Sequence, residues 1–203
     1  MIRAFLAVEL GDVLTPQVVQ VQQELKQRLG RDLAKGVRLA WVQPSLIHLT
    51  IKFLGDTDEA LIDPLREALA QAVASHQRIQ IPLERLGVFP RPEQPRVLWV
   101  GAGTAWEQGQ GARQLASLHQ AVEACCESQG FAPEGRPLSP HLTLARIKEG
   151  ERLVGQALAK SGVMDRALSL EPLTVGAIAL MKSDLRPTGP VYTKLWEAKL
   201  TSE

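Results

Sequence analysis

The sequence predicts a mixed α/β (α+β) fold of two similar lobes with a central cleft. Segments typical of strands alternate with segments typical of helices along the 203 residues. A short motif at residues 44–51 recurs in compressed form at residues 139–144. Each copy lies about halfway through its own half of the chain. We therefore expect a single bilobal domain over residues 1–203, with duplicated halves related by a pseudo-two-fold axis.

The first elements are expected to be a buried strand and a helix. Residues 2–9 form a short apolar run, which favours a strand over a helix. Thr15 then has the character of a helix N-cap, because Pro16 suits the first helical position. Gly30 is expected to end this helix.

Residues 38–54 are rich in β-formers and are divided at Gln43-Pro44, so they predict two strand segments. A second helix fits residues 58–75, where apolar side chains recur on one face and Pro64 lies near the first turn. The alternation continues with strands expected at 79–86, 96–102, 139–147, 173–185 and 191–200 and helices at 111–129 and 151–161.

The overall charge argues against a broad surface that follows a polynucleotide. The chain has 23 Lys and Arg against 22 Asp and Glu, so the charges nearly cancel. A strongly basic surface is typical of tight, salt-sensitive nucleic-acid binding. The balance still allows a small basic pocket that binds one phosphate.

The cysteines and the hydropathy favour a cytoplasmic protein. The adjacent Cys125 and Cys126 are poorly placed for an ordinary disulfide, because neighbouring helical residues point in different directions. A secreted disulfide framework is therefore not expected. The N-terminal run is too short and too soon charged for a signal peptide, and no apolar run approaches membrane-spanning length. We expect no membrane partner and, without a sign of assembly, a monomer.

The repeated motif brings titratable side chains together. Residues two apart on a strand point to the same face, so His48 and Thr50 share one face. The same holds for His141 and Thr143. If the two strands lie side by side, two imidazoles and two hydroxyls converge on the cleft.

Such a group suits the cleavage of a phosphodiester without a metal. One histidine can be neutral and take a proton from water, while the other is charged and protonates the departing ribose oxygen. The hydroxyls of Thr50 and Thr143 can donate hydrogen bonds to the non-bridging phosphate oxygens.

Other chemistries fit the sequence less well. A single His-x-Thr is more often structural, but the chain has two in the same His-Leu-Thr-aliphatic frame. A metal site lacks a third ligand at a recognisable spacing. A Gly-rich phosphate loop and a nucleophile elbow are absent, and the cysteines lie within a helix. His76 and His119 have no matching partner, and we interpret both as structural or solvated.

His48-Leu49-Thr50-Ile51 and His141-Leu142-Thr143-Leu144 resemble the paired His-x-Thr-x signatures of the 2H phosphoesterase superfamily. Within it, the chain resembles the RNA 2′,3′-cyclic phosphodiesterases, historically called 2′-5′ RNA ligases. The resemblance runs nearly end to end. Outside the signatures it is carried by residues 3–7, 52–55, 95–101, Arg146 and residues 185–192.

The resemblance implies a bilobal 2H phosphoesterase fold with two antiparallel-type sheets and no cofactor. It implies hydrolysis of RNA ends that bear a 2′,3′-cyclic phosphate, giving a 2′-phosphomonoester. It also implies that His48 donates a proton to the 3′ oxygen and His141 accepts one from water; the residues alone leave these roles interchangeable. A reversible 2′–5′ joining of RNA ends, tRNA halves among them, would be the same chemistry run backwards.

Two charged residues near the signatures are candidates for phosphate binding. Lys52 has the strand parity of His48, so it either faces the cleft or is a solvated lysine at a sheet edge. The resemblance assigns phosphate binding to Arg146, although its parity opposes that of His141. The strand parity and phosphate binding by Arg146 are compatible only if the strand ends or bulges near Ala145.

Aromatic residues could bind a terminal base. Phe53 and Phe89 are candidates to stack on it, with core packing favoured for Phe53 and open for Phe89. Three tryptophans on apolar strand segments are interpreted as core: Trp41, Trp99 and Trp196.

Two further readings of the function stay open. The chain could be an RNA-end binding module with weak or no catalysis. It could also be a 2H phosphodiesterase that acts on small cyclic nucleotides or on 2′,5′-oligoadenylates. Keeping both histidines speaks against a binding module, since binding needs cations more than a titrating pair.

Overall fold

A computed structural model describes residues 1–33, 35–187 and 189–201, without the side chains of Arg31 and Asp32. Helices and strands alternate as expected. The main helices are α1 (Leu14–Asp32), α2 (Ile62–Val73), α3 (Thr104–Glu107), α4 (Gln110–Ser128) and α5 (Glu151–Ser161). The strands are β1 (Ile2–Glu9), β2 (Arg38–Trp41), β3 (His48–Thr57), β4 (Ile79–Ile81), β5 (Arg85–Phe89), β6 (Val97–Gly101), β7 (Leu142–Glu149), β8 (Leu173–Val175), β9 (Ala177–Arg186) and β10 (Gly189–Lys199).

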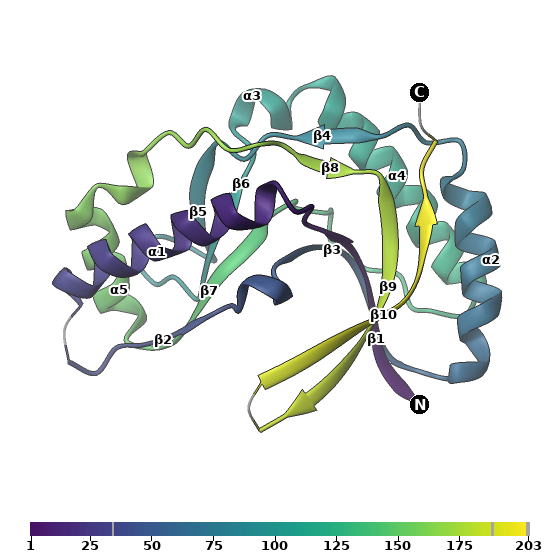
Figure 1. Ribbon diagram of the computed structural model, residues 1–203, viewed down its shortest axis with the longest axis horizontal. Coiled ribbons are helices and arrows are strands. Elements are labelled where there is room, and N and C mark those ends of the chain that lie inside the picture. Colours follow the sequence, from purple (N-terminus) through teal and green to yellow (C-terminus); the bar gives the residue numbers. More distant parts are fainter. Residues whose placement is uncertain (34, 188, 202–203) are drawn as a thin grey trace.

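The strands form two antiparallel sheets of four, which confirms the predicted α/β fold class. One sheet has the order β10-β9-β1-β3 and the other the order β2-β7-β6-β5. Figure 1 shows the first sheet with α2 and α4 on the right and the second sheet with α1 and α5 on the left. Each sheet contains one signature segment, because His48 begins β3 and His141 directly precedes β7.

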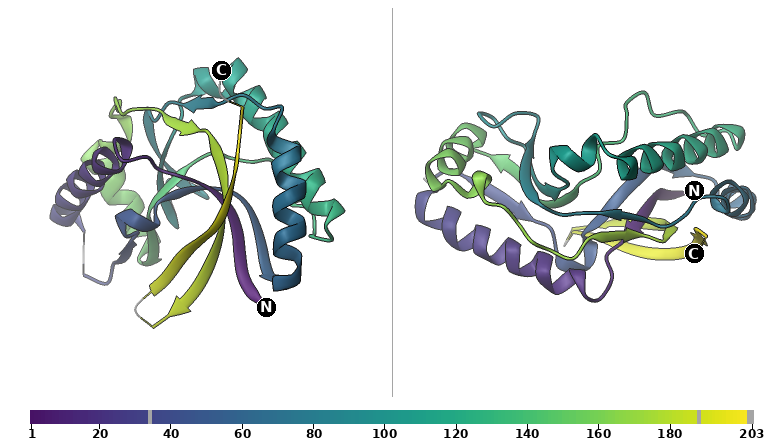
Figure 2. Two further views of the ribbon diagram at one scale, coloured as in Figure 1. Left: turned by 45° about the vertical axis from the view of Figure 1, so that its right-hand side comes forward. Right: turned by 90° about the horizontal axis from the view of Figure 1, so that it is seen from above.

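Helices cover the outer side of each sheet, as the two views of Figure 2 show. Helix α2 packs against α4 and β10, and α1 packs against α5. Buried apolar side chains from both halves of the chain form one continuous core. The short ladder between β4 and β8 lies along the top of Figure 1. Among the described residues, no helix is long and apolar enough to cross a membrane.

Several predicted boundaries were wrong. Helix α1 begins at Leu14 and runs past Gly30 to Asp32. Thr15 is inside the helix, where its hydroxyl donates to the Gly11 carbonyl instead of capping. The expected strand at 79–86 is two strands, β4 and β5, which belong to different sheets. Helix α3 was not predicted, and Thr188, between the expected strands at 173–185 and 191–200, lies outside the described residues.

Both signature strands contain a β-bulge just after the threonine. In the β1–β3 ladder, Leu6 pairs with Lys52 and Ala7 with Thr50, so Ile51 is an extra residue. In the β6–β7 ladder, Leu98 pairs with Ala145 and Trp99 with Thr143. One extra residue exchanges the two faces of a strand from that point on. The duplication therefore includes the bulge as well as the motif.

The bulge in β3 shows that the expected position of Lys52 in the cleft was wrong. The Lys52 side chain is 1% exposed and points into the core behind the sheet. Its Nζ donates to both carboxylate oxygens of Glu123 on α4, at 2.9 and 2.7 Å, and to the Ala132 carbonyl at 2.9 Å. The Glu134 backbone N–H donates to the same carboxylate at 2.9 Å. Lys52 thus joins β3 to α4 and to the segment that leads to β7.

Burial alone would raise the pKa of Glu123, but the hydrogen bonds from Lys52 and from the Glu134 N–H hold it below its ordinary value of 4.5. The folded protein therefore holds this proton less tightly than the unfolded chain. The resulting stability is present above pH 4.5 and is lost as the pH falls through the lowered pKa.

Replacing Lys52 by Met should destabilise the fold, because the partly buried Glu123 carboxylate would lose its cation. Breaking one side of a buried ion pair costs about 3–5 kcal/mol. Denaturant unfolding at neutral pH should show this loss as a lower midpoint. The double variant Lys52→Met/Glu123→Leu removes both charges and should recover most of it. A Lys52→Met protein as stable as the wild type would contradict this role.

Candidate active site

Both signature histidines are fixed in the same way by the chain that precedes them. His48 Nδ1 lies 2.8 Å from the Leu46 carbonyl oxygen, and His141 Nδ1 lies 2.7 Å from the Ser139 carbonyl oxygen. A carbonyl only accepts, so Nδ1 of each ring carries a proton and donates it. The nitrogen left to gain or lose a proton is Nε2 in both rings.

Aromatic rings surround each imidazole. The Phe5 ring centroid lies 4.9 Å from that of His48, and the Tyr192 centroid lies 5.4 Å from it. On the other side, Phe89 lies 5.0 Å from His141 and Trp99 lies 6.2 Å from it. Phe5 comes from β1, which pairs with β3, whereas Phe89 comes from β5, which pairs with β6 and not with β7. These rings hold the imidazoles and remove water from them.

A glycine allows Trp99 to occupy its place. Gly87 pairs with Trp99 across the β5–β6 ladder. A Cβ at position 87 would lie 2.0 Å from the Trp99 ring, which is far inside van der Waals contact. Only glycine lets the indole lie across the neighbouring strand, where it supports His141.

Burial is the main reason that both histidines have lowered pKa values. For His48, burial lowers the pKa, the hydrogen bond to Leu46 opposes this, and the charges of Arg146 and His141 lower it further. For His141, burial and then Arg146 lower the pKa against the bond to Ser139. Only His48 has a carboxylate acting on it, because the charge of Glu9 raises its pKa slightly.

The bulges determine which residues that follow each histidine in its strand also have their side chains in the cleft. Past the extra residue, Phe53 shares the face of His48, is 62% exposed and lines the cleft. The favoured core position of Phe53 was therefore wrong. Past the bulge at Leu144-Ala145, Arg146 shares the face of His141, as the expected bulge near Ala145 required. Phe53 and Arg146 each lie five residues after their histidine.

A buried glutamine holds the bulge in β7. The bulged Leu144 has a carbonyl that accepts from the Val42 N–H at 3.0 Å and from Gln22 Nε2 at 2.9 Å. Gln22, on α1, is 1% exposed, and its amide also donates to the Val42 carbonyl at 2.7 Å. The irregular backbone is thus satisfied by a side chain from another element.

The cleft between the two sheets has a volume of about 850 Å³. It brings together His48, His141, Thr50, Thr143, Arg146 and Phe53. Phe89 does not line it, since its ring packs against Trp99 and His141. Among the lining residues that sequence reasoning missed are Arg3, Trp41, Lys148 and Tyr192. Trp41, expected in the core, is only partly buried there.

Other reactive groups lie outside this cleft. His119 and Glu123 face each other on α4 at 3.6 Å, in keeping with a structural histidine. Both cysteines are free and buried, and burial raises the pKa of Cys126 to about 12, so its thiol is a poor nucleophile. Within the described part of the chain, no three His, Cys, Asp or Glu side chains are grouped to hold a metal ion.

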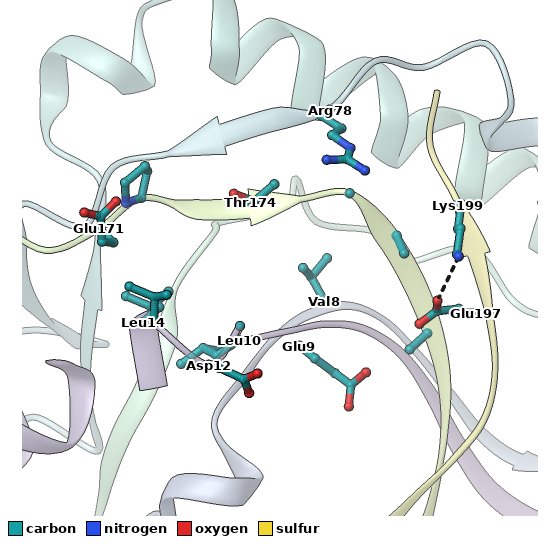
Figure 3. Close-up of a pocket in the computed structure, with 16 residues that line it drawn as sticks. Val8, Glu9, Leu10, Asp12, Leu14, Arg78, Glu171, Thr174, Glu197 and Lys199 are labelled. Carbon is teal, nitrogen blue, oxygen red and sulfur yellow. Dashed lines mark ion pairs between the residues drawn. The ribbon is translucent and has the colours of Figure 1, made fainter. Parts of the chain in front are cut away.

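A second depression lies near the end of β1 and is shown in Figure 3. Carboxylates outnumber cations among its labelled side chains. Lys199 forms an ion pair with Glu197 at 3.9 Å. Arg78 is the other cation there. None of the residues predicted for catalysis lines it. The acidic members are Glu9, Asp12, Glu171 and Glu197.

Known proteins are similar to this chain in sequence and in fold. A family model of the 2′-5′ RNA ligase superfamily matches residues 23–187. An RNA 2′,3′-cyclic phosphodiesterase of Aeropyrum pernix is 36% identical over 167 residues, 82% of this chain and 89% of that protein. One of Methanothermobacter thermautotrophicus is 28% identical over 96% of both chains. The crystal structure of TT0787 of Thermus thermophilus covers 99% of both chains with a TM-score of 0.68 and 27% identity. Escherichia coli LigT in apo form covers 98% of both chains with a TM-score of 0.67 and 21% identity, which supports the fold.

Replacing Phe5 by Leu should raise the pKa of His48 toward the ordinary value of 6.5, because the smaller side chain admits water to the ring. The pKa of His141 should not follow, since Phe5 does not touch it. NMR titration of the imidazole signals measures both pKa values. In the matched experiment, Phe89→Leu should raise the pKa of His141 and leave that of His48 unchanged. Because the swap leaves part of the buried ring volume unfilled, it should also lower the stability by about 0.5–3 kcal/mol. Equal shifts in both histidines, or none in either, would contradict separate aromatic surroundings.

Proposed function

Because this chain belongs to the 2′-5′ RNA ligase superfamily, we propose that it is an RNA 2′,3′-cyclic phosphodiesterase that uses two histidines and no metal. Its substrate is an RNA end with a 2′,3′-cyclic phosphate, and its product is a 2′-phosphomonoester. One observation carries the proposal. Two imidazoles, each tethered through Nδ1 to a carbonyl, line the same cleft as two threonines and an arginine.

The reaction would proceed by attack of water in line with the 3′ oxygen. His141 Nε2 takes a proton from water as the oxygen bonds to phosphorus. The bond from phosphorus to the 3′ oxygen breaks, and that oxygen takes the proton of His48 Nε2. The two imidazoles end with their protonation states exchanged, and proton exchange with solvent restores them.

The difference between the two histidines supports this division of roles. The proton donor must start charged, and the base must start neutral. Glu9 lies opposite His48 in the β1–β3 ladder, and its charge favours protonated His48. Burial and the Arg146 charge favour the neutral form of both rings, and the Glu9 charge opposes them at His48.

The remaining polar groups would stabilise the charge that develops on phosphorus. The hydroxyls of Thr50 and Thr143 can donate to the non-bridging oxygens, one from each signature strand. Arg146 can contribute a guanidinium to the same oxygens. Phe53 offers an exposed ring for the terminal base. Lys52 is too deep to contact substrate, and Phe89 acts through the His141 ring.

Ligation is the same step with a ribose hydroxyl in the place of water. The hydroxyl would give its proton to the base, and its oxygen would displace a phosphate ester oxygen at the same phosphorus. We infer that RNA ends, tRNA halves among them, are the partners. We also infer that residues 1–203 act as a single bilobal domain, as a monomer and in the cytoplasm.

Replacing either His48 or His141 by Ala should lower kcat by about 10²–10⁴-fold, since each performs one proton transfer. The assay is hydrolysis of a short RNA ending in a 2′,3′-cyclic phosphate, with EDTA present throughout. His76→Ala is the control, because His76 follows α2 and does not line the cleft.

Full activity of either variant would contradict the two-histidine mechanism, and loss of wild-type activity in EDTA would contradict independence from metal. A protein that binds these ends without turnover would instead be an RNA-end binding module. Turnover of small cyclic nucleotides or 2′,5′-oligoadenylates alone would change the substrate. A 3′-phosphate product would contradict the assignment of the leaving oxygen.

Replacing Phe53 by Ala should raise KM with little effect on kcat, because a stacked base is held equally before and during the reaction. Stacking on an aromatic ring contributes about 1–3 kcal/mol per base, so KM should rise roughly 5- to 150-fold. Leu153→Ala is the matched control, since Leu153 is an exposed apolar side chain on α5. An unchanged KM would contradict the stacking role.

A further inference from the structure

The cleft contains more positive charge than one phosphate requires. Arg3, Arg146 and Lys148 all line it, and no Asp or Glu side chain of the described residues does. All three cations are exposed. None of them forms an ion pair with a side chain that the structure describes. A whole chain with a net charge of +1 thus concentrates unpaired cations at one place.

Arg146 is the cation nearest the reacting groups. Its charge lowers the pKa of both His48 and His141, so it lies close to both rings. Together with two threonine hydroxyls, it suffices for the oxygens of one phosphate. Arg3 and Lys148 are therefore left for another anion.

The two further cations line the same cleft as Arg146. Lys148 lies on the face of β7 that carries Arg146, while the intervening Ile147 is buried. Two residues along a strand span about 6.6 Å, so the backbone of Lys148 lies farther along β7 from His141 than that of Arg146 by about this distance. Arg3 is on β1, on the side of the cleft lined by Phe53 and Tyr192. Burial raises the pKa of Tyr192, and the charges of Arg146 and Arg3 both oppose this, which places Arg3 near the phenol.

The opposite end of the same sheet is acidic. Beyond His48, the depression of Figure 3 has the carboxylates of Glu9, Asp12, Glu171 and Glu197, of which Glu9 and Glu197 form ion pairs with Lys194. A polyanion is repelled by such a surface and attracted by the cationic end of the cleft. The direction in which an RNA strand leaves the site is therefore set by charge.

We propose that Arg3 and Lys148 form a second phosphate site, which binds the phosphate on the 5′ side of the terminal nucleotide. The inference rests on the proposed function and narrows its substrate class. The enzyme acts on the ends of polynucleotides and discriminates against free cyclic mononucleosides. Because phosphate contacts carry no sequence information, this preference is independent of the base.

The test compares adenosine 2′,3′-cyclic phosphate with the same compound carrying a 5′-phosphate. The ratio of the two kcat/KM values isolates the second phosphate without adding a second base. The wild type should favour the 5′-phosphorylated compound about tenfold or more. Lys148→Gln and Arg3→Gln should each lower this ratio, and the double variant should bring it close to one. Lys148→Arg should retain most of the preference.

Salt provides an independent measurement. Salt screens the attraction between exposed charges, so contact of the second phosphate with cations should steepen the fall of log(kcat/KM) with salt concentration. The 5′-phosphorylated substrate should show this extra slope in the wild type but not in the double variant. Lys199→Gln, in the acidic depression, should change neither the slope nor the ratio.

A wild-type ratio near one, or a ratio that survives the double variant, would overturn the second phosphate site. If neither compound is hydrolysed, the assay on a short RNA ending in a 2′,3′-cyclic phosphate decides the proposed function, and binding still decides the inference. Calorimetry would then compare adenosine 2′-phosphate with adenosine 2′,5′-bisphosphate. Tighter binding of the bisphosphate, lost in the double variant, supports the site. Equal affinities contradict it.

Discussion

The site depends on one extra residue in each of two strands. Without the bulges at Ile51 and at Leu144, strand alternation would bury Phe53 and Arg146 and would turn Lys52 toward the cleft. With them, each strand presents a histidine, a threonine and then a third functional side chain on one face. The bulged Leu144 carbonyl is satisfied by the Val42 N–H and by Gln22, so this irregularity is stabilised by the fold.

The duplication makes the two histidines alike, and the proposed chemistry needs them to differ. Nδ1 of both is held by a carbonyl two residues earlier, and both are packed against phenylalanine. The rest of the surroundings differ, because Glu9 and Tyr192 lie near His48, whereas Trp99 lies near His141. A symmetric frame with unequal neighbours can hold one ring charged and the other neutral.

Much of the fold and the central site could be predicted from the sequence, because the repeat and the alternation of apolar residues are local signals. The contents of the cleft could not all be predicted. Lys52 shares strand parity with His48, and only its pairing with the distant Glu123 shows that it is buried. Arg3, Trp41, Lys148 and Tyr192 come from segments whose convergence depends on sheet order, which no local pattern encodes.

A crystal structure with a nucleoside 2′-phosphate tests the central claim most directly. The account predicts that the phosphorus lies between Nε2 of His48 and Nε2 of His141, within hydrogen-bonding reach of the Thr50 and Thr143 hydroxyls. It also predicts that the ribose 3′ hydroxyl lies on the side of His48. A phosphate bound outside the cleft, for example between Arg78 and Lys199, or imidazoles turned away from it, would contradict the account.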